Sequence, residues 1–336
     1  MPVRIAINGF GRIGRAAYRV AYSMKGVEVV AINDLSDAPT LAYLLQHDTL
    51  YGRYEQNVVA EGSALVVGAS KKKTVIYNEK DPSLLPWKKL GVDVVLECTG
   101  RFTDEQGASA HLKAGAKRVI ISAPAKGDGV PTVVLGVNDP KKLPKNAIVS
   151  NASCTTNCIS PVAEVIHRNL GVLKATMTTI HSYTSDQNLH DGSHRDLRRA
   201  RAAALNIIPT TTGAAIATTE VVPELKNKFD GLSIRVPTPV VSLADFTFLL
   251  KRTTTIEEVN KILERATKEK RYQGILAVTR EEVVSSDFIG STYSSIVDLS
   301  LTSVIDGDLL KVIAWYDNEW GYSNRLVELA LAIGKK

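Results

Sequence analysis

Residues 3–14 read VRIAINGFGRIG, an apolar run followed at once by three spaced glycines. The run Val3–Asn8 predicts a buried strand, and the amphipathic stretch Arg12–Met24 after it predicts a helix. The glycines therefore occupy a turn between a strand and a helix. In that context G-x-G-x-x-G is typical of dinucleotide binding rather than of an ordinary turn. The sequence predicts that the chain opens as the first unit of a nucleotide-binding sheet.

Each glycine has a predicted role in this turn. Gly9 would permit the tight turn, Gly11 would let a pyrophosphate approach the backbone, and Gly14 would let the helix pack closely on the strand. The diphosphate would rest on the helix N-terminus, at Arg12 and Ile13, where unpaired N–H groups are available.

An acidic residue follows the second predicted strand. Val27–Asn33 is apolar and is followed by Asp34, twenty positions after Gly14. A carboxylate at this distance accepts hydrogen bonds from the ribose hydroxyls of the adenosine and repels a 2′-phosphate. The predicted cofactor is therefore NAD.

The rest of the first half alternates short apolar runs with amphipathic segments, which is typical of a parallel sheet wrapped by helices. Thr99, Gly100 and Ser122 fall at carboxyl ends of predicted strands, the edge at which ligands of such sheets bind. Cys98 lies within a predicted buried strand and is interpreted as a small apolar residue. Further strands are predicted at Val92–Cys98, Arg118–Ser122 and Ile148–Asn151, and a further helix at Asp104–Ala114.

A cysteine stands among small hydrogen-bonding residues where the first half ends. The run Ser150–Cys158 reads SNASCTTNC and leads into an apolar-periodic segment that predicts a helix. Cys154 would lie at the N-terminus of that helix, where unpaired N–H groups and the positive end of the dipole favour the nucleophilic thiolate. Cys158, one helical turn further along, is predicted to be buried and inert.

A histidine that could serve this thiol ends a strand-like segment. His181 leads into a long polar stretch, Ser182–Asn206, of the kind in which functional residues concentrate. Imidazole suits both roles needed, ion-pair partner of the thiolate and general base. His47, His111 and His167 lie in helical patterns and are interpreted as structural. Nucleotide fold, thiol and imidazole together point to an aldehyde-oxidising dehydrogenase.

The second half of the chain has a different pattern of apolar residues. Val172–His181 and Val240–Lys251 are long, β-branched and partly alternating, which favours antiparallel strands. The predicted fold is an α/β Rossmann-type domain with a parallel sheet, residues 1–151 and 317–336, that binds NAD(P). An α+β catalytic domain with a mostly antiparallel sheet would span residues 152–316. Further elements are predicted as a helix at Ile256–Lys268, a strand at Leu309–Asp317 and a closing helix at Glu319–Ile333.

Composition narrows the class of protein. The chain has 336 residues, 44% hydrophobic and 23% charged, which fits a globular protein of two domains. A net charge of +6 is compatible with anionic small substrates and is only weak evidence for nucleic acid, so no specific nucleic-acid partner is predicted. Three cysteines make no disulfide framework, and a single Cys-x3-Cys predicts no metal site. No apolar run approaches the ~18 residues of a membrane span, and no leader peptide precedes the first strand, so a cytoplasmic protein is expected.

These motifs resemble one family from end to end. The stretches Ile7–Arg15 and Trp315–Ser323, and above all the heptad Ala152–Cys158, are similar to phosphorylating glyceraldehyde-3-phosphate dehydrogenases of the bacterial and organellar type. The resemblance implies oxidation of D-glyceraldehyde 3-phosphate to 1,3-bisphosphoglycerate with reduction of NAD(P), through a hemithioacetal and a thioester. It also implies a homotetramer, with Ser182–Asn206 as a loop that reaches a neighbouring subunit.

The resemblance assigns roles to residues at matching positions. Cys154 would be the nucleophile and His181 the base. Substrate phosphate would be held by Thr184 and Arg235. The attacking inorganic phosphate would be held by four small residues: Ser153, Thr155, Thr212 and Gly213. The nicotinamide ring would be fixed by Asn318 and Tyr322.

Three positions depart from the family pattern. Ser193 stands where NAD-specific members carry the proline of a Leu-Pro pair, and a serine there can meet a 2′-phosphate. Leu35 after Asp34, in contrast, is typical of NAD-preferring members. The hypothesis is NAD as the preferred cofactor with NADP usable. Ile216 replaces a lysine common near the phosphate sites, and His190 stands in a part of the loop that is usually apolar.

Two other functions stay open on the sequence alone. An enzyme with the same Cys/His mechanism could act on erythrose 4-phosphate and release the free acid by water attack. A protein of another class could use this fold to bind NAD or RNA without catalysis. The presence of Cys154, His181, Arg235 and Asn318 favours an enzyme.

Overall fold

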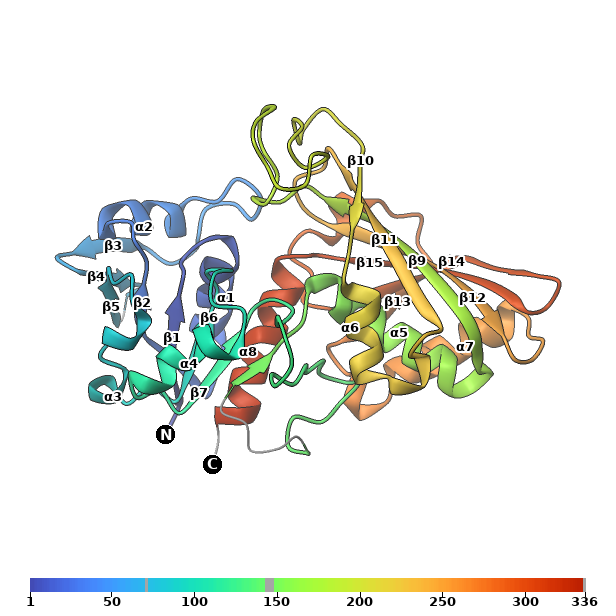
Figure 1. Cartoon of the computed structure of the whole chain (residues 1–336), viewed down its shortest axis with the longest axis horizontal. Helices are drawn as coiled ribbons and strands as arrows, with labels where there is room; N and C mark the ends of the chain where they lie inside the picture. Colours follow the sequence, from blue (N-terminus) through green and yellow to red (C-terminus); the bar gives the residue numbers. More distant parts are fainter. Residues whose placement is uncertain (70–71, 143–147, 335–336) are drawn as a thin grey trace. The chain divides into compact units, whose positions relative to one another are not determined.

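The computed structural model describes residues 1–69, 72–142 and 148–334, and the chain divides into two compact units (Figure 1). Unit 1 comprises the described residues of Met1–Val133, Asp139–Ala152 and Ser323–Lys336. Unit 2 comprises Val134–Asn138 and Ser153–Tyr322.

Unit 1 is built on a sheet in which the described residues form eight strands, in the order β3-β4-β5-β2-β1-β6-β7-β8. From β5 to β8 all neighbours are parallel, whereas β3, β4 and β5 form an antiparallel meander at one edge. The parallel strands follow the 3-2-1-4-5-6 order of the Rossmann fold, so this part of the predicted fold is confirmed. The strands are β1 (Val3–Asn8), β2 (Val27–Asn33), β3 (Val58–Glu61), β4 (Ala64–Val67), β5 (Lys72–Tyr77), β6 (Val94–Glu97), β7 (Arg118–Ile121) and β8 (Ile148–Ser150).

The central strands of unit 1 are covered on both faces. Ile5, Ala6 and Ile7 of β1 are fully buried, as the continuous apolar run predicts for a parallel sheet. Asp104 caps the fourth helix by accepting a hydrogen bond from the backbone N–H of Gly107. The helices are α1 (Arg12–Ser23), α2 (Ala38–Gln46), α3 (Trp87–Leu90) and α4 (Glu105–Lys113), with α8 (Trp320–Gly334) beginning in unit 2 and ending in unit 1.

Unit 2 holds a second sheet, in which the described residues form seven strands in the order β10-β11-β9-β12-β15-β14-β13. Four neighbouring pairs are antiparallel, and β11–β9 and β13–β14 are parallel, so the predicted mostly antiparallel sheet is confirmed. The strands are β9 (Val172–Ser182), β10 (Ile208–Thr211), β11 (Phe229–Val236), β12 (Ser242–Leu250), β13 (Leu276–Thr279), β14 (Ser295–Ile305) and β15 (Leu309–Tyr316).

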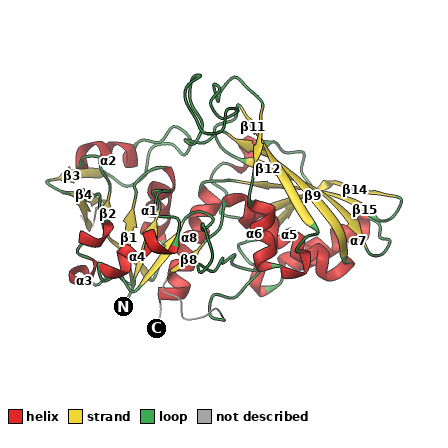
Figure 2. Ribbon diagram, viewed as in Figure 1, coloured by secondary structure: helices red, strands yellow, loops and turns green. Residues whose placement is uncertain are grey.

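Three helices lie along this second sheet: α5 (Cys154–Leu170), α6 (Ala214–Val221) and α7 (Ile256–Thr267) (Figure 2). Helix α5 contacts β9, β12, β14 and β15, and it also contacts both other helices. Alternate residues of β12 are buried, as expected for a strand with one face on a core. Core packing therefore fixes α5 against the face of this sheet.

The chain reverses between α5 and β9, which sets the position of the site. Gly171 takes a left-handed φ of 68° directly after α5 and lets β9 run back along the helix. Helix α5 has 17 residues and β9 has 11, so their lengths are about 26 Å and about 36 Å. The last residues of β9 are thereby brought back to the N-terminus of α5.

Candidate active site

A cavity of about 320 Å³ opens at the carboxyl edge of the parallel sheet in unit 1. Four of the predicted cofactor residues line it: Gly9, Gly11, Asp34 and Thr99. The remaining lining residues were not predicted to bind the cofactor. They lie at or just after the ends of β1, β2, β5 and β6: Asn8, Asn33, Leu35, Glu79, Lys80, Cys98, Arg101 and Phe102. The interpretation of Cys98 as a buried strand residue was wrong, because β6 ends at Glu97 and the partly exposed Cys98 faces this cavity.

The three glycines differ in what surrounds them. A Cβ on Gly9, which has φ +90°, would lie 2.8 Å from the carbonyl carbon of Cys98. A Cβ on Gly14 would collide with the carbonyl oxygen of Gly9. Around a Cβ on Gly11, in contrast, no atom of the described residues lies within 4 Å. Gly9 and Gly14 are therefore required by the fold, and Gly11 leaves open space beside the cavity and the N-terminus of α1.

This contrast predicts that two alanine substitutions affect different properties, stability for Gly14 and NAD binding for Gly11. Gly14→Ala should lower the free energy of unfolding by about 3 kcal/mol, because its Cβ meets backbone that cannot move aside. Gly11→Ala should lower it by less than about 1 kcal/mol and weaken NAD binding at least about tenfold, because its Cβ fills the space left for the pyrophosphate. Urea unfolding and NAD titration of both variants measure this. Equal losses of stability would contradict the assignment of Gly11.

Asp34 is held in place from both sides. Its Oδ2 accepts from the backbone N–H of Phe10 at 2.7 Å, and its Oδ1 accepts from that of Ser36 at 2.9 Å. Each carboxylate oxygen keeps a second lone pair for a ribose hydroxyl at the cavity. Together with the space at Gly11, this arrangement fits an adenosine diphosphate group.

A buried hydrogen-bond network holds two of the residues that line the cavity. Glu97 is 1% exposed, and it accepts from Asn8 Nδ2 at 2.6 Å and from the backbone N–H of Thr99 at 2.8 Å. His111 Nδ1 must accept from Trp87 Nε1, which can only donate, so His111 Nε2 carries the hydrogen that it directs to Glu97 at 3.0 Å. His111 is thus structural, and the fixed tautomer orients two residues that line the cavity.

The other predicted cofactor residues lie outside this lining. Arg12 and Ile13 begin α1, and the Arg12 guanidinium pairs with Asp48 at 2.8 Å. Five predicted residues lie elsewhere. Gly100 is exposed with φ 69°, Ser122 directly follows β7, Ser193 is an exposed residue of unit 2, and Asn318 and Tyr322 are buried in unit 2.

In unit 2, the thiol and the imidazole meet as predicted. Cys154 is the first residue of α5, and its Sγ lies 3.5 Å from Nε2 of His181 at the end of β9. His181 Nδ1 lies 2.7 Å from the carbonyl oxygen of Ser182, which can only accept, so Nδ1 carries the hydrogen. The basic Nε2 is therefore directed at the sulfur. The ring of Tyr316 packs edge-on against His181 and limits its rotation.

The electrostatics of this pair have opposing causes. Burial raises the pKa of the Cys154 thiol, whereas the charge of Arg235 and hydrogen bonds from Thr155 lower it. Burial, followed by the charge of Arg235, lowers the pKa of His181 to about 3. The predicted influence of the helix N-terminus is present, but desolvation outweighs it for the isolated thiol. Proton transfer within the pair, which places opposite charges side by side, adds to these influences and favours the thiolate.

A positively charged anion-binding seat, formed by Arg235 and Thr184, adjoins the Cys154–His181 pair. Arg235 of β11 stands opposite His181 in the parallel ladder with β9. Its Nη1 donates to Thr184 Oγ1 at 3.0 Å and to the carbonyl oxygen of Ser182 at 3.2 Å. The structure thus brings Thr184 and Arg235 together beside the base, as their predicted common ligand requires.

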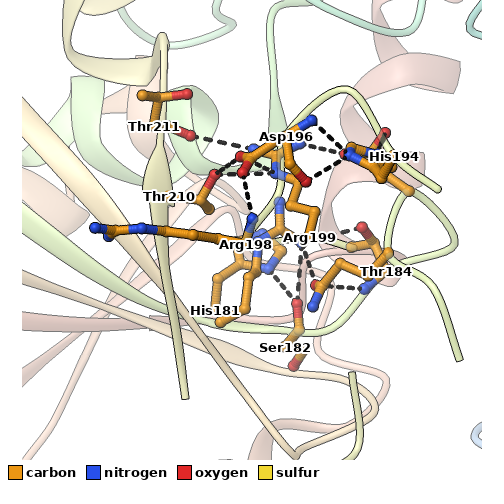
Figure 3. A network of polar contacts seen from close by, with 12 residues as sticks. His181, Ser182, Thr184, His194, Asp196, Arg198, Arg199, Thr210 and Thr211 are labelled. Atoms are coloured by element: carbon orange, nitrogen blue, oxygen red, sulfur yellow. Dashed lines mark hydrogen bonds and ion pairs between the residues drawn. The ribbon is translucent and has the colours of Figure 1, made fainter. Parts of the chain in front are cut away.

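Arg199, from the polar stretch Ser182–Asn206, belongs to the same neighbourhood. Its charge acts on both His181 and Arg235. Asp186 pairs with its Nη1, and Thr210 Oγ1 accepts from its Nε at 3.0 Å (Figure 3). Asp196 Oδ2 lies 3.4 Å from the same Nε, so two carboxylates hold the Arg199 guanidinium beside the Arg235–Thr184 seat.

The four residues predicted to hold inorganic phosphate occupy the starts of two helices. Ser153 caps α5 by accepting from the backbone N–H of Thr156 at 3.0 Å, and Thr155 Oγ1 lies 2.9 Å from the Tyr316 hydroxyl. Thr212 accepts from the backbone N–H of Ala214 at 3.2 Å, and Gly213 caps α6. Ile216, one of the departures, is 63% exposed on α6.

A Rossmann-type sheet with an adenosine-sized cavity, and a thiol faced by an oriented imidazole, define the class. Such proteins are nicotinamide-dependent dehydrogenases that oxidise aldehydes through an enzyme cysteine.

Comparison with known proteins identifies the family. Residues 3–105 match the family model "Glyceraldehyde 3-phosphate dehydrogenase, NAD binding domain", and residues 153–318 match its C-terminal domain. The whole chain is 52% identical to glyceraldehyde-3-phosphate dehydrogenases of Geobacillus stearothermophilus and Zymomonas mobilis, in both cases over 337 residues that cover 99% of the relative. A Mycolicibacterium smegmatis relative is 51% identical over 342 residues, across 100% of this chain and 99% of its own. The chain belongs to the glyceraldehyde-3-phosphate dehydrogenase family, which confirms the resemblance.

Within residues 1–69, 72–142 and 148–334, no group of three or more His, Cys, Asp or Glu side chains could hold a metal ion. Across that same part of the chain, no helix has the length and apolar character that a membrane crossing requires.

Proposed function

We propose that this protein oxidises D-glyceraldehyde 3-phosphate to 1,3-bisphosphoglycerate with reduction of NAD, through a thioester on Cys154. The observation that carries the proposal is the 3.5 Å approach of Cys154 Sγ to His181 Nε2, with the Arg235–Thr184 seat beside it. Family membership and relatives of that name support this substrate. They do not favour a non-catalytic binding protein or an erythrose-4-phosphate dehydrogenase.

The residues divide the chemistry between them. The Cys154 thiolate adds to the aldehyde carbon, and the aldehyde oxygen takes the proton that His181 Nε2 received from the thiol, which gives the hemithioacetal and a neutral imidazole. His181 Nε2 then takes the hydroxyl proton while hydride leaves the same carbon, and a thioester remains. NAD, when bound, supplies the hydride acceptor, and Gly9, Gly11 and Asp34 would hold its adenosine half.

Inorganic phosphate completes the reaction. One of its oxygens attacks the thioester carbon, the carbon–sulfur bond breaks, and the thiolate is regenerated with release of the acyl phosphate. Hydroxyls and helix-terminal N–H groups suit this dianion, and they are offered by Ser153, Thr155, Thr212 and Gly213. Thr184 and Arg235 would hold the phosphate of the aldehyde substrate.

NADH formation tests the proposal directly. Absorbance of reduced nicotinamide is followed with glyceraldehyde 3-phosphate, with and without phosphate or arsenate, and with erythrose 4-phosphate for comparison. The proposal expects steady turnover only with phosphate or arsenate present. Phosphate-independent turnover that is faster on erythrose 4-phosphate would contradict it.

Four further features belong to the proposal. Residues 1–151 and 317–336 would form the NAD(P)-binding domain, and residues 152–316 the catalytic domain. Asn318 and Tyr322 would hold the nicotinamide ring, and the Ser242 hydroxyl, 3.1 Å from Asn318 Oδ1, would orient that amide.

Asp34 supports a preference for NAD, and Ser193 supports some use of NADP. Steady-state kinetics with both cofactors decides between them. A cytoplasmic homotetramer is the assembly that we expect.

A further inference from the structure

Gln187 is a buried amide behind the Arg235–Thr184 seat. It is 8% exposed, and its Oε1 accepts from Arg235 Nη1 at 3.5 Å and from the backbone N–H of Thr184 at 3.3 Å. Its own backbone N–H donates to the carbonyl oxygen of Thr184 at 2.9 Å. Since both groups that face the amide are donors, the atom between them is the oxygen, and Nε2 occupies the other position.

Two donors at this place have no partner. Gln187 Nε2 and Arg235 Nε are both buried, and neither has a hydrogen-bond partner among the described residues. A buried donor without an acceptor costs about 1–3 kcal/mol. Two such donors on contacting side chains indicate that an acceptor with several oxygens belongs there.

Charge limits what that acceptor can be. Arg235 carries one positive charge, and the charge of Arg199 acts on it as well. Asp186, paired with Arg199, is the acidic group that also acts on Arg235. Asp186 and Asp196 both pair with Arg199, whereas no carboxylate among the described residues forms an ion pair with Arg235. The charge of Arg235 is therefore left for an anion with several oxygens, such as a phosphate monoester.

We propose that Gln187 positions the phosphate of the substrate. Its Nε2 donates to a phosphate oxygen, and its Oε1 holds Arg235 and Thr184 in the orientation that receives the same group. Gln187 thereby sets the preference for phosphorylated over unphosphorylated aldehydes. This inference rests on the proposed function and adds a specificity residue to it.

The test compares two aldehydes that differ only in the phosphate. kcat/KM is measured with glyceraldehyde 3-phosphate and with glyceraldehyde, for the unaltered protein and for Gln187→Met and Gln187→Glu. Gln187→Met removes both hydrogen-bonding atoms at similar volume. Gln187→Glu keeps Oε1 and replaces only the Nε2 donor by an oxygen that repels phosphate. Ser233→Ala is the matched control, because Ser233 Oγ is another buried group of β11 without a partner among the described residues.

Gln187→Met should lower kcat/KM for the phosphorylated aldehyde about 10- to 100-fold through KM, and Gln187→Glu should lower it further. Gln187→Met should leave kcat/KM for glyceraldehyde, and the rate at which iodoacetamide alkylates Cys154, within about twofold of the values for the unaltered protein. Ser233→Ala should leave the ratio between the two aldehydes unchanged. An equal loss on both aldehydes, or no loss on the phosphorylated one, overturns the role of Gln187. If the unaltered protein does not discriminate between the aldehydes, the proposed function itself fails.

Discussion

Replacing Cys154 with alanine is expected to abolish NADH formation, with a loss of more than about 10⁴-fold in kcat. The reason is that no other nucleophile can form the thioester at this position. His181 Nε2 lies 3.5 Å from the sulfur, and in the variant it would face only the methyl group of alanine, which cannot attack an aldehyde. Steady-state absorbance and single-turnover acylation measure the loss. NAD binding should persist within about twofold, since the cavity of unit 1 does not include Cys154.

Cys158→Ala is the matched control. Cys158 lies one turn further along α5 and is fully buried, with its sulfur 3.5 Å from the hydroxyl of Ser295. Burial raises the pKa of this thiol to about 12, so it is not a nucleophile near neutral pH. The control should keep its turnover within a few-fold, with a small loss of stability. Turnover by Cys154→Ala at a rate near that of the control would refute the covalent mechanism.

Local patterns in the sequence predicted the start of the fold well. Val3–Asn8 and Val27–Asn33 have the predicted bounds, and α1 ends one residue before its predicted end. These elements are recognisable because each is a continuous apolar run or a helical period bounded by glycine or a polar turn. The antiparallel meander of β3, β4 and β5 was missed, because short edge strands are defined by their partners rather than by their own residues.

In the candidate site, too, some residues could be predicted from the sequence and others could not. The pairing of Cys154 with His181 could be predicted, since a short helix-to-strand reversal fixes their proximity. Glu97 could not, because its carboxylate accepts from Asn8, 89 positions away in the chain. Arg199 could not either, since only the fold of the loop brings it towards Arg235. The pKa of Cys154 depends on desolvation, which follows from the surroundings in space and not from the helix start alone.

Replacing His181 with asparagine is expected to lower kcat about 10²- to 10⁴-fold and to leave NAD binding intact. Asparagine can keep a hydrogen bond to the carbonyl oxygen of Ser182 but offers no base to take the hemithioacetal proton. The hydride step should become rate-limiting, so a substrate deuterated at the aldehyde carbon should show a primary isotope effect. An unchanged kcat would contradict the role of His181 as base.

The His181→Asn variant also separates two influences on the pKa of Cys154, burial and the charge of a protonated His181. Burial alone raises the pKa of Cys154, and the opposing stabilisation of the thiolate by a protonated imidazole is lost when His181 is removed. A higher pKa means that the thiolate forms only at higher pH. The rate of alkylation by iodoacetamide should therefore fall at pH 7, and its pH profile should shift upward relative to the unaltered protein. A Gln187→Met protein, whose Cys154–His181 pair is retained, should keep the original profile. An unshifted profile in His181→Asn would show that Arg235 and the helix N-terminus stabilise the thiolate without the imidazole, and His181 would then be a base only.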